Sequence, residues 1–459
     1  MPSRHRMHAS DPTGTQTAMT GSVDVLARII GVPLHGLRLA GVEPAAKLSP
    51  NELRGTAHLL GRGIMGTLWQ ARRRAPRWDE ISRAWSQGAR TSNEIDVGLY
   101  GRFAPEDRLT LLTNNREAFA TRARLCASAR TSVDLATYYL HDDETGRSTV
   151  RALVDAARRG VRVRLCADAY IMQKKAYEGL GVLCLVDELH AGGVEVRLWR
   201  DASRPYDTNH RKMLSVDGRA MLIGGRNIAD HYEGSAWRDV DLLVEGPTAA
   251  EAIGLFERTF AGATEPSRIG SLAGGVLHAT MPADVTTHAN FVYLLQCLRA
   301  ARRSVDIENA YYFSHEAVAE QIAATCRRGV RVRVFTNSAE SNDLDYANYR
   351  LYSGFRAVLR SGAELWLRRG KGRTLHCKYF VADGAWVSLG SSNLDYYSPR
   401  YCTEANVHAF SEELGAQLTT WFEEGLADAE RLTDEAAIEQ VLRAQTVSRA
   451  VDALLRDVQ

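Results

Sequence analysis

The sequence contains two stretches with the same pattern of polar residues, HRKMLSVDGRAMLIGGRN at residues 210–227 and HCKYFVADGAWVSLGSSN at residues 376–393. Both follow the spacing H-x-K-x4-D-x6-G-[G/S]-x-N. In each stretch an Asp-Gly pair stands between two apolar runs, which is typical of the turn of a β-hairpin. We therefore expect equivalent hairpins in two related parts of the protein.

The hairpins predict which side chains lie together. Residues two apart in a strand share a face, so each stretch gathers one His, one Lys and one Asn: His210, Lys212 and Asn227, and His376, Lys378 and Asn393. If Asp217-Gly218 is a two-residue turn, Val216 pairs with Arg219 and Lys212 lies opposite Ile223. The same reasoning places His376 opposite Ser391.

Segments around the two stretches also recur, in the same order and at offsets of 166 to 172 residues. Ser132-Val-Asp returns at Ser304, Arg158-Arg-Gly-Val-Arg-Val-Arg returns at Arg327, and Gly193-Val-Glu returns as Gly362-Ala-Glu. Such ordered self-similarity indicates an internal duplication. The chain is therefore expected to consist of two tandem repeats.

Each repeat alternates helical and strand-like segments. The patterns predict helices at 148–159 and 316–328, each followed by a strand, at 161–167 and 330–336. This alternation indicates an α/β fold with a partly parallel sheet in each repeat. The predicted organisation is an extension at 1–105 that is helical beyond residue 22, a first repeat at 106–265, a connector within 261–275 and a second repeat at 266–459 with a helical tail.

The clustered residue types suit a phosphoryl group. An ammonium neutralises phosphate oxygens, a carboxamide donates hydrogen bonds, and an imidazole attacks phosphorus or transfers a proton. Two histidines are what a double displacement needs, one as nucleophile and one as acid for the leaving group. Lysine is rare here, since only six of the 57 basic residues are lysine, yet both motif positions hold one.

The duplicated motif resembles that of the phospholipase D superfamily. Within it, Tyr138-Tyr139, Gly224-Gly225-Arg226-Asn227-Ile228-Ala229-Asp230 and Trp237-Arg238-Asp239-Val240-Asp241 are most similar to bacterial cardiolipin synthases of the C type. The resemblance implies two phospholipase D-like repeats packed as a pseudo-twofold pair, a single active site where they meet, a phosphohistidine intermediate and no metal or other cofactor.

The resemblance also implies roles for individual residues. His210 corresponds to the nucleophile and His376 to the general acid and base. An acidic residue after each motif orients its histidine, which by spacing assigns Asp239 to His210 and Glu404 to His376. Asp217 and Asp383, the Asp of each motif, are expected to brace the hairpins rather than to move protons.

The implied function is a phosphatidyltransferase or phospholipase D-type enzyme that cleaves a phosphatidylglycerol-like lipid and transfers the phosphatidyl group to an alcohol. An endonuclease of the same superfamily is the alternative, and a non-catalytic binding protein is a third possibility. A net charge of +2 argues against a protein that mainly coats nucleic acid. The oligomeric state and the acceptor alcohol stay open.

Location is also predicted from the sequence. No run of about 18 apolar residues is present, and the first residues lack the apolar core of a secretory signal. Seven scattered cysteines without a C-x-x-C pair favour a reducing compartment. We expect a cytoplasmic protein bound peripherally to the inner face of the cell membrane, with Leu59–Arg74 as a candidate interfacial helix or, equally, a helix packed on the first repeat.

Overall fold

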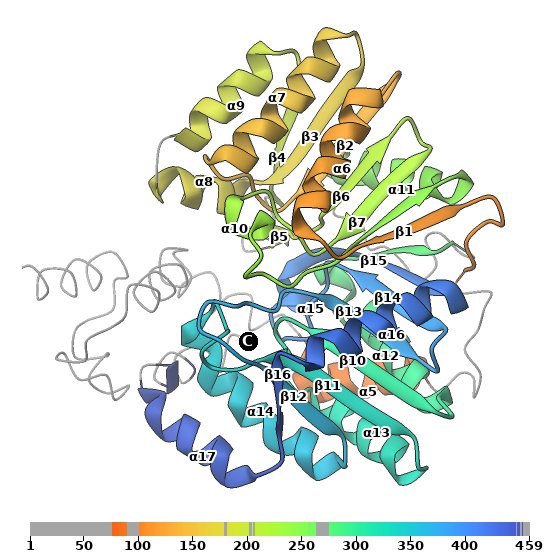
Figure 1. The fold of residues 1–459 in the computed structure, drawn as a ribbon, viewed down its shortest axis with the longest axis vertical. Coiled ribbons are helices and arrows are strands. Elements are labelled where there is room, and N and C mark those ends of the chain that lie inside the picture. Colours follow the sequence, from red (N-terminus) through yellow and green to blue (C-terminus); the bar gives the residue numbers. More distant parts are fainter. Residues whose placement is uncertain are drawn as a thin grey trace, which may run out of the picture.

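The protein has two stacked lobes, each built on a mixed β-sheet with helices packed on both of its faces (Figure 1). The computed structural model describes residues 76–89, 101–178, 181–201, 204, 207–262, 275–446, 448, 449 and 452. The candidate interfacial helix at Leu59–Arg74, the first 75 residues and most of the predicted connector lie outside these residues.

The first repeat forms a seven-stranded sheet of order β1-β8-β7-β6-β2-β3-β4. Its strands are β1 (Arg108–Leu112), β2 (Ser132–Thr137), β3 (Arg162–Asp168), β4 (Glu195–Trp199), β6 (Met213–Val216), β7 (Ala220–Gly224) and β8 (Asp241–Glu245). Strands β2, β3 and β4 are parallel, and the others are antiparallel. The helices are α6 (Asn115–Ser128), α7 (Glu144–Arg158), α8 (Ala169–Glu178), α9 (Gly181–Ala191), α10 (Asp230–Glu233) and α11 (Glu251–Ala261).

The second repeat has the same strand order. Strands β12-β11-β10-β13-β14-β15 correspond to β4-β3-β2-β6-β7-β8, and β9 pairs with β15 as β1 pairs with β8. They are β9 (Leu277–Thr280), β10 (Ser304–Asn309), β11 (Arg331–Asn337), β12 (Glu364–Arg368), β13 (Lys378–Ala382), β14 (Trp386–Gly390) and β15 (Cys402–Phe410), with β16 (Ala429–Leu432) added beside β12. The helices are α12 (Ala289–Ala300), α13 (Glu316–Arg327), α14 (Asn348–Ser361), α15 (Ser398–Tyr401), α16 (Glu412–Leu426) and α17 (Glu435–Ala444). The predicted pair of mixed α/β repeats is thus confirmed.

The duplication is also visible in buried ion pairs. In the first repeat, the guanidinium of Arg164 bridges Asp134 at 2.8 Å and Glu257 at 2.7 Å. In the second repeat, Arg333 bridges Asp306 at 2.7 Å and Glu423 at 2.7 Å. The recurring Ser-Val-Asp and Val-Arg-Val-Arg segments each end in one partner of the buried Asp–Arg pair.

The apolar residues form three cores. One lies under α6, α7 and α9 of the first repeat, and another lies under α12, α13 and α14 of the second. The third joins the repeats: Met221 and Ile223 of β7 contribute to it together with Tyr379 of β13 and Leu389 of β14. Because this core is shared, the two sheets are held face to face and their ends are positioned relative to one another.

The predicted hairpins form, but their register is shifted by one residue. Asp217 and Gly218 have φ of 53° and 65°, as a two-residue turn with both centres left-handed requires. Val216 nevertheless pairs with Ala220, which leaves Arg219 as an extra residue in the turn. The Arg219 carbonyl instead accepts a hydrogen bond from Gly246 N–H, just after β8. The expected pairing of Lys212 with Ile223 is therefore wrong, and Met213 takes that place.

The second hairpin repeats this shift, with Ala382 opposite Trp386 and the Ala385 carbonyl bonded to Ser411 N–H. The pairing predicted for His376 and Ser391 is consequently wrong by one residue as well.

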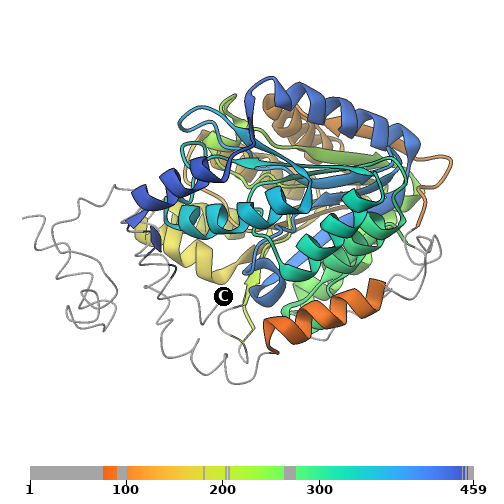
Figure 2. The ribbon, with the colours of Figure 1, turned by 90° about the horizontal axis from the view of Figure 1, so that it is seen from below.

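A helix that precedes both repeats packs on the second one. Helix α5 (Trp78–Gly88) lies alongside its helices (Figure 2). The indole of Trp85 is buried, stacks on Phe291 with ring centroids 4.3 Å apart, and donates to the Val285 carbonyl at 2.6 Å. This part of the N-terminal extension is thus integrated into the second core.

Candidate active site

The two motifs meet at the boundary between the lobes. Strand β5 (Thr208–Asn209), immediately before His210, pairs in parallel with the start of β15, and Arg238 forms a parallel bridge with Leu375, immediately before His376. Each histidine is thereby placed against a strand of the other repeat. A positive charge on His210 lowers the pKa of His376, and the charge of Lys378 lowers the pKa of His210, as expected for neighbours in one site.

The acidic partners of the histidines are exchanged between the repeats. Nδ1 of His210 lies 2.9 Å from Oε1 of Glu404, and Nδ1 of His376 lies 2.7 Å from Oδ2 of Asp239. The assignment by sequence spacing, Asp239 to His210 and Glu404 to His376, is therefore wrong. The strand pairing across the boundary explains this, because each acid follows the segment that docks against the opposite histidine.

Glu404 is held as an ionised carboxylate. It accepts hydrogen bonds from Ser391 Oγ at 2.5 Å and from Ser398 Oγ. Burial alone would raise the pKa of Glu404, but His210, Lys212 and the Ser391 bond outweigh it and hold that pKa below its usual value. Burial in turn lowers the pKa of His210 to about 4, against the opposing pull of Glu404. A neutral His210 that donates Nδ1–H to Glu404 leaves its Nε2 lone pair free to attack.

His376 lies in a more enclosed, aromatic setting. Its ring is 5.0 Å from that of Tyr232, 5.2 Å from Trp237 and 6.3 Å from Tyr311. Burial, together with the charges of Lys378 and Lys212, lowers the pKa of His376 well below its usual value. Burial also raises the pKa of Asp239. His376 is accordingly neutral in the free protein.

The two lysines are buried beside the histidines. Nζ of Lys212 donates to the His210 carbonyl at 2.6 Å, and Nζ of Lys378 lies 2.5 Å from the His376 carbonyl and 2.9 Å from His376 Nδ1. Burial lowers the pKa of Lys212 to about 7 and that of Lys378 to about 8. An anion bound between them restores their full charge, because an opposite charge favours the protonated amine.

The motif asparagines retain unused hydrogen-bonding capacity. Nδ2 of Asn227 donates to the Tyr232 hydroxyl at 2.7 Å, whereas Oδ1 of Asn227 and Oδ1 of Asn393 are buried without a partner. Rotation of the Asn227 amide by half a turn would let its carbonyl accept from Tyr232 and direct its NH2 to a bound oxygen. Such unpaired buried groups are costly unless a ligand uses them.

Asp217 and Asp383 are not brought to this cluster. Both lie in the hairpin turns, where the Asp217 carboxylate accepts from the backbone N–H groups of Arg130, Thr131 and Ser132. Asp383 accepts from Arg302, Arg303 and Ser304 in the same way. The hydrogen bonds tie each turn to the segment that leads into β2 or β10.

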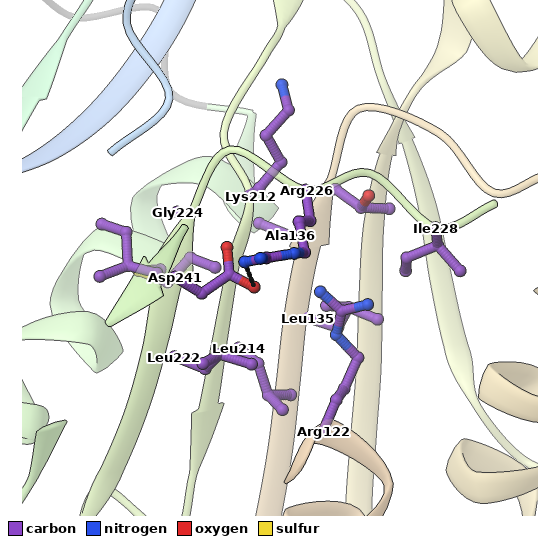
Figure 3. Close-up of a pocket in the computed structure, with 13 residues that line it drawn as sticks. Arg122, Leu135, Ala136, Lys212, Leu214, Leu222, Gly224, Arg226, Ile228 and Asp241 are labelled. Carbon is purple, nitrogen blue, oxygen red and sulfur yellow. Dashed lines mark ion pairs between the residues drawn. The ribbon is translucent and has the colours of Figure 1, made fainter. Parts of the chain in front are cut away.

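A small cavity of about 10 Å³ lies behind Lys212, the size of a single water molecule. Figure 3 shows Arg122 and the Arg226–Asp241 ion pair around it, while the Lys212 ammonium points away from them. Arg226 also donates to the backbone carbonyl of Asp239. These buried residues support the segment that carries Asp239. The cavity between them is too small to hold a substrate.

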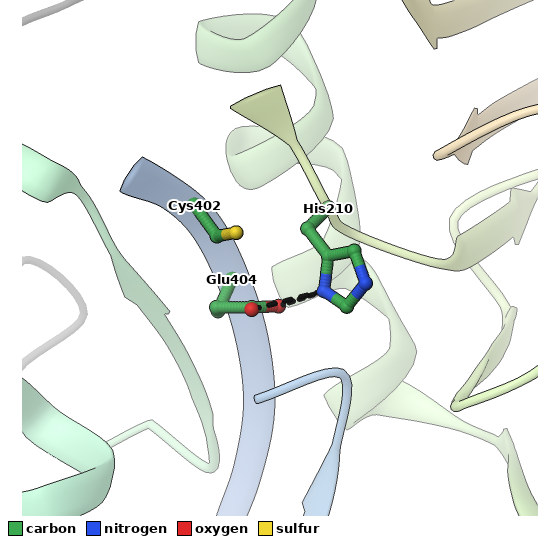
Figure 4. Close-up of side chains that lie close together, drawn as sticks. All are labelled: His210, Cys402 and Glu404. Atoms are coloured by element: carbon green, nitrogen blue, oxygen red, sulfur yellow. Dashed lines mark hydrogen bonds and ion pairs between the residues drawn. The ribbon is translucent and has the colours of Figure 1, made fainter. Parts of the chain in front are cut away.

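His210, Cys402 and Glu404 lie close enough for three donor atoms to share an ion (Figure 4). Burial and the neighbouring Glu404 charge, however, raise the pKa of Cys402 well above its usual value, which opposes the deprotonation that metal binding requires. A protonated thiol is a poor metal ligand. The hydrogen bond between His210 and Glu404 explains the arrangement without an ion.

The aromatic side chains and the serines of this site had no role predicted from the sequence. Tyr138 faces His210 edge-on with ring centroids 4.9 Å apart, and Tyr311 faces His376 edge-on at 6.3 Å. The recurring Tyr-Tyr pairs, Tyr138-Tyr139 and Tyr311-Tyr312, were the available signal. Ser398 carried no signal, because its contact with Glu404 depends on the turn of α15.

Comparison with known proteins supports the same grouping. A family model described as "Cardiolipin synthase, PLD-like domain" matches residues 123–261 and 294–426. Cardiolipin synthase A of Pseudomonas syringae is 27% identical over 394 residues, which is 78% of this chain and 80% of that protein. Cardiolipin synthase of Geobacillus kaustophilus is 26% identical over 372 residues, covering 75% of this chain and 72% of the relative. The assignment to the C type stays a prediction.

Solved structures show the same fold. Phosphatidylserine synthase of Haemophilus influenzae superimposes with a TM-score of 0.61 at 14% identity, over 76% of this chain and 92% of that one. Polyphosphate kinase of Porphyromonas gingivalis gives a TM-score of 0.51 at 13% identity, over 78% of this chain and 55% of that one. The family match extends over both repeats and includes both H-x-K motifs. The chain therefore belongs to the cardiolipin synthase family of phospholipase D-like proteins.

Proposed function

We propose that this protein is a phosphatidyltransferase that makes cardiolipin-type lipids from phosphatidylglycerol through a phosphatidyl-histidine. The observation that carries the proposal is the meeting of two H-x-K motifs in one site, with each histidine held at Nδ1 by a carboxylate of the other repeat. The family and its relatives favour lipid chemistry over the alternative of DNA cleavage.

In the first step, Nε2 of His210 attacks the phosphorus of the donor lipid. Glu404 orients the imidazole and stabilises the positive charge that develops on it. The bond from phosphorus to the glycerol headgroup breaks, and His376 protonates the departing alkoxide. The phosphodiester anion offsets the charges of Lys212 and Lys378, which raises the pKa of His376 and allows it to hold that proton.

In the second step, His376 removes a proton from the hydroxyl of the acceptor alcohol. The alkoxide oxygen attacks phosphorus, the P–N bond to His210 breaks, and the free enzyme returns. Both steps develop negative charge on the equatorial phosphate oxygens, where the two ammonium groups and the asparagine amides stabilise it. The motif lysines thus replace the cation that other phosphoryl-transfer enzymes use.

The substrates place the reaction at a lipid surface. No helix among the described residues is long and apolar enough to cross a bilayer. All seven cysteines are free thiols, which fits a reducing compartment. We therefore propose peripheral action on the cytoplasmic face of the membrane, with the headgroup of a second phosphatidylglycerol as the acceptor.

Vesicles of phosphatidylglycerol test the activity. The full chain should convert them to cardiolipin and release one glycerol for each cardiolipin formed, as thin-layer chromatography and glycerol assay would record. Phosphatidic acid as the only product would make the protein a hydrolase. If the vesicles stayed unchanged while DNA was cut, the proposal would be wrong and the endonuclease alternative correct.

Cardiolipin formation is expected to survive EDTA. Two lysines and two asparagines can stabilise the transition state without a cation. The rate after dialysis against millimolar EDTA should therefore stay within about twofold of the untreated rate. A loss of activity that zinc or another divalent ion restores would instead show that His210, Glu404 and Cys402 bind a metal.

A further inference from the structure

A tyrosine–carboxylate pair flanks His376 on the side of the second repeat. The Tyr311 ring faces His376 edge-on, and Nζ of Lys378 lies 6.0 Å from the centre of that ring. The Tyr311 hydroxyl donates to Oδ1 of Asp343 at 2.8 Å. Tyr311 is buried, whereas Asp343 is partly exposed. The pair therefore extends from His376 toward solvent and ends in a carboxylate.

Asp343 follows β11 in the loop before the short helix η4 (Asp345–Ala347). This loop lies at the carboxyl end of the parallel strands, where α/β sheets bind their ligands. Burial raises the pKa of Asp343 above its usual value, and the Tyr311 hydrogen bond and the Lys378 charge offset part of that rise. The Tyr311 hydroxyl and the backbone N–H of Asp343 are its hydrogen-bond donors, and a carboxylate has about four acceptor sites, so it can also accept from a ligand.

The two repeats differ at this point. Tyr138 stands beside His210 and Lys212 as Tyr311 stands beside His376 and Lys378. At the position in the first repeat that corresponds to Asp343, counted from the aligned strands β3 and β11, the sequence has Lys174, and Lys175 lies over the Tyr139 ring at 5.1 Å. At this sequence position the second repeat thus has a carboxylate where the first repeat has a lysine. The carboxylate repels a phosphodiester and attracts hydrogen-bond donors.

We propose that Asp343, oriented by Tyr311, selects the alcohol that leaves or enters beside His376 by accepting a hydrogen bond from a second donor group of that alcohol. A glycerol headgroup provides this donor as a neighbouring hydroxyl, and an ethanolamine headgroup provides it as an ammonium. The inference rests on the proposed phosphatidyl transfer. It makes Asp343 a specificity residue and Tyr311 a positioning residue.

Competition between two alcohols for one phosphatidyl-enzyme tests this inference. The full chain is given phosphatidyl-p-nitrophenol in mixed vesicles with equal concentrations of glycerol and 1-propanol, which lacks a second donor. The ratio of phosphatidylglycerol to phosphatidylpropanol is measured by mass spectrometry. At early times, before the phosphatidylglycerol product is itself consumed, this ratio depends on acceptor choice, so a change in the amount of active enzyme or in the donor step leaves it unaltered.

Asp343→Asn should lower the ratio about tenfold, the effect of losing one hydrogen bond to a charged group. Tyr311→Phe should lower it by a smaller factor, because the carboxylate stays but is no longer oriented. The control is Glu340→Gln, which removes a charge from the same loop and should leave the ratio unchanged. Glu340 holds Gly370 N–H at 2.7 Å, a bond that the Gln carbonyl can still accept.

The outcomes separate the possible sources of the donor group and the possible failures. If ethanolamine replaces glycerol and Asp343→Asn lowers its ratio to 1-propanol even more, an ammonium headgroup is the better partner. An unchanged ratio in Asp343→Asn, or an equal drop in Glu340→Gln, would overturn the inference while leaving the transfer chemistry intact. Absence of p-nitrophenol release by the wild-type protein would overturn the proposed function itself.

Discussion

A His210→Asn variant is expected to form no covalent adduct with any phosphatidyl donor. In the wild-type protein Glu404, held by Ser391 and Ser398, orients the His210 imidazole so that Nε2 can attack, and asparagine has no equivalent nitrogen. Intact-mass measurement after an acid-free quench should show only the unmodified chain, even with phosphatidyl-p-nitrophenol. Turnover should fall to the background rate, a loss of several orders of magnitude for removal of a covalent nucleophile.

The companion variant His376→Asn should behave differently. A p-nitrophenolate leaving group needs no proton, so the phosphatidyl adduct should still form on His210. It should then persist, because no base activates the acceptor alcohol. A melting temperature near that of the wild-type protein would establish that both variants are folded. An adduct in His210→Asn together with none in His376→Asn would reverse the roles of the two histidines.

Lys378→Arg is expected to lower kcat by about 100-fold or more, on the scale of one lost electrostatic donor in a transition state. The Lys378 side chain is almost fully buried, and its ammonium fits between the His376 carbonyl at 2.5 Å and Nδ1 at 2.9 Å. A planar guanidinium is larger and directs its donors elsewhere. The charge is preserved, so the loss would come from position alone.

Steady-state cardiolipin synthesis from phosphatidylglycerol measures this effect. Lys371→Arg is the matched control, since Lys371 is an exposed lysine in a nearby turn and its replacement should leave kcat within about twofold. Lys212→Arg should resemble Lys378→Arg, because Lys212 is buried in the same way. Near-wild-type rates for both buried variants would mean that these positions need only a positive charge.

Much of the architecture was predictable because it depends on short-range patterns. The helix predicted at 148–159 corresponds to α7 and the one at 316–328 to α13, each followed by the expected parallel strand. The Asp-Gly pairs predicted both turns, because few other residue pairs place two successive residues in the left-handed conformation. The pairing register of the two hairpins was predicted wrongly because the carbonyls of Arg219 and Ala385 bond to neighbouring segments. Those segments lie outside the hairpins, so the local pattern does not contain this information.

The residues of the site likewise divide into those that short-range patterns predict and those that depend on contacts between distant segments. The sequence by itself determined that one His, one Lys and one Asn recur at a set spacing, because a strand places alternate side chains on one face. Only the tertiary structure decided that Glu404 serves His210 and Asp239 serves His376, because two chain segments pair across the repeats. It also decided the low pKa of both histidines and the place of Asp343 beside His376, since burial and distances between remote segments appear only when the sheets pack face to face.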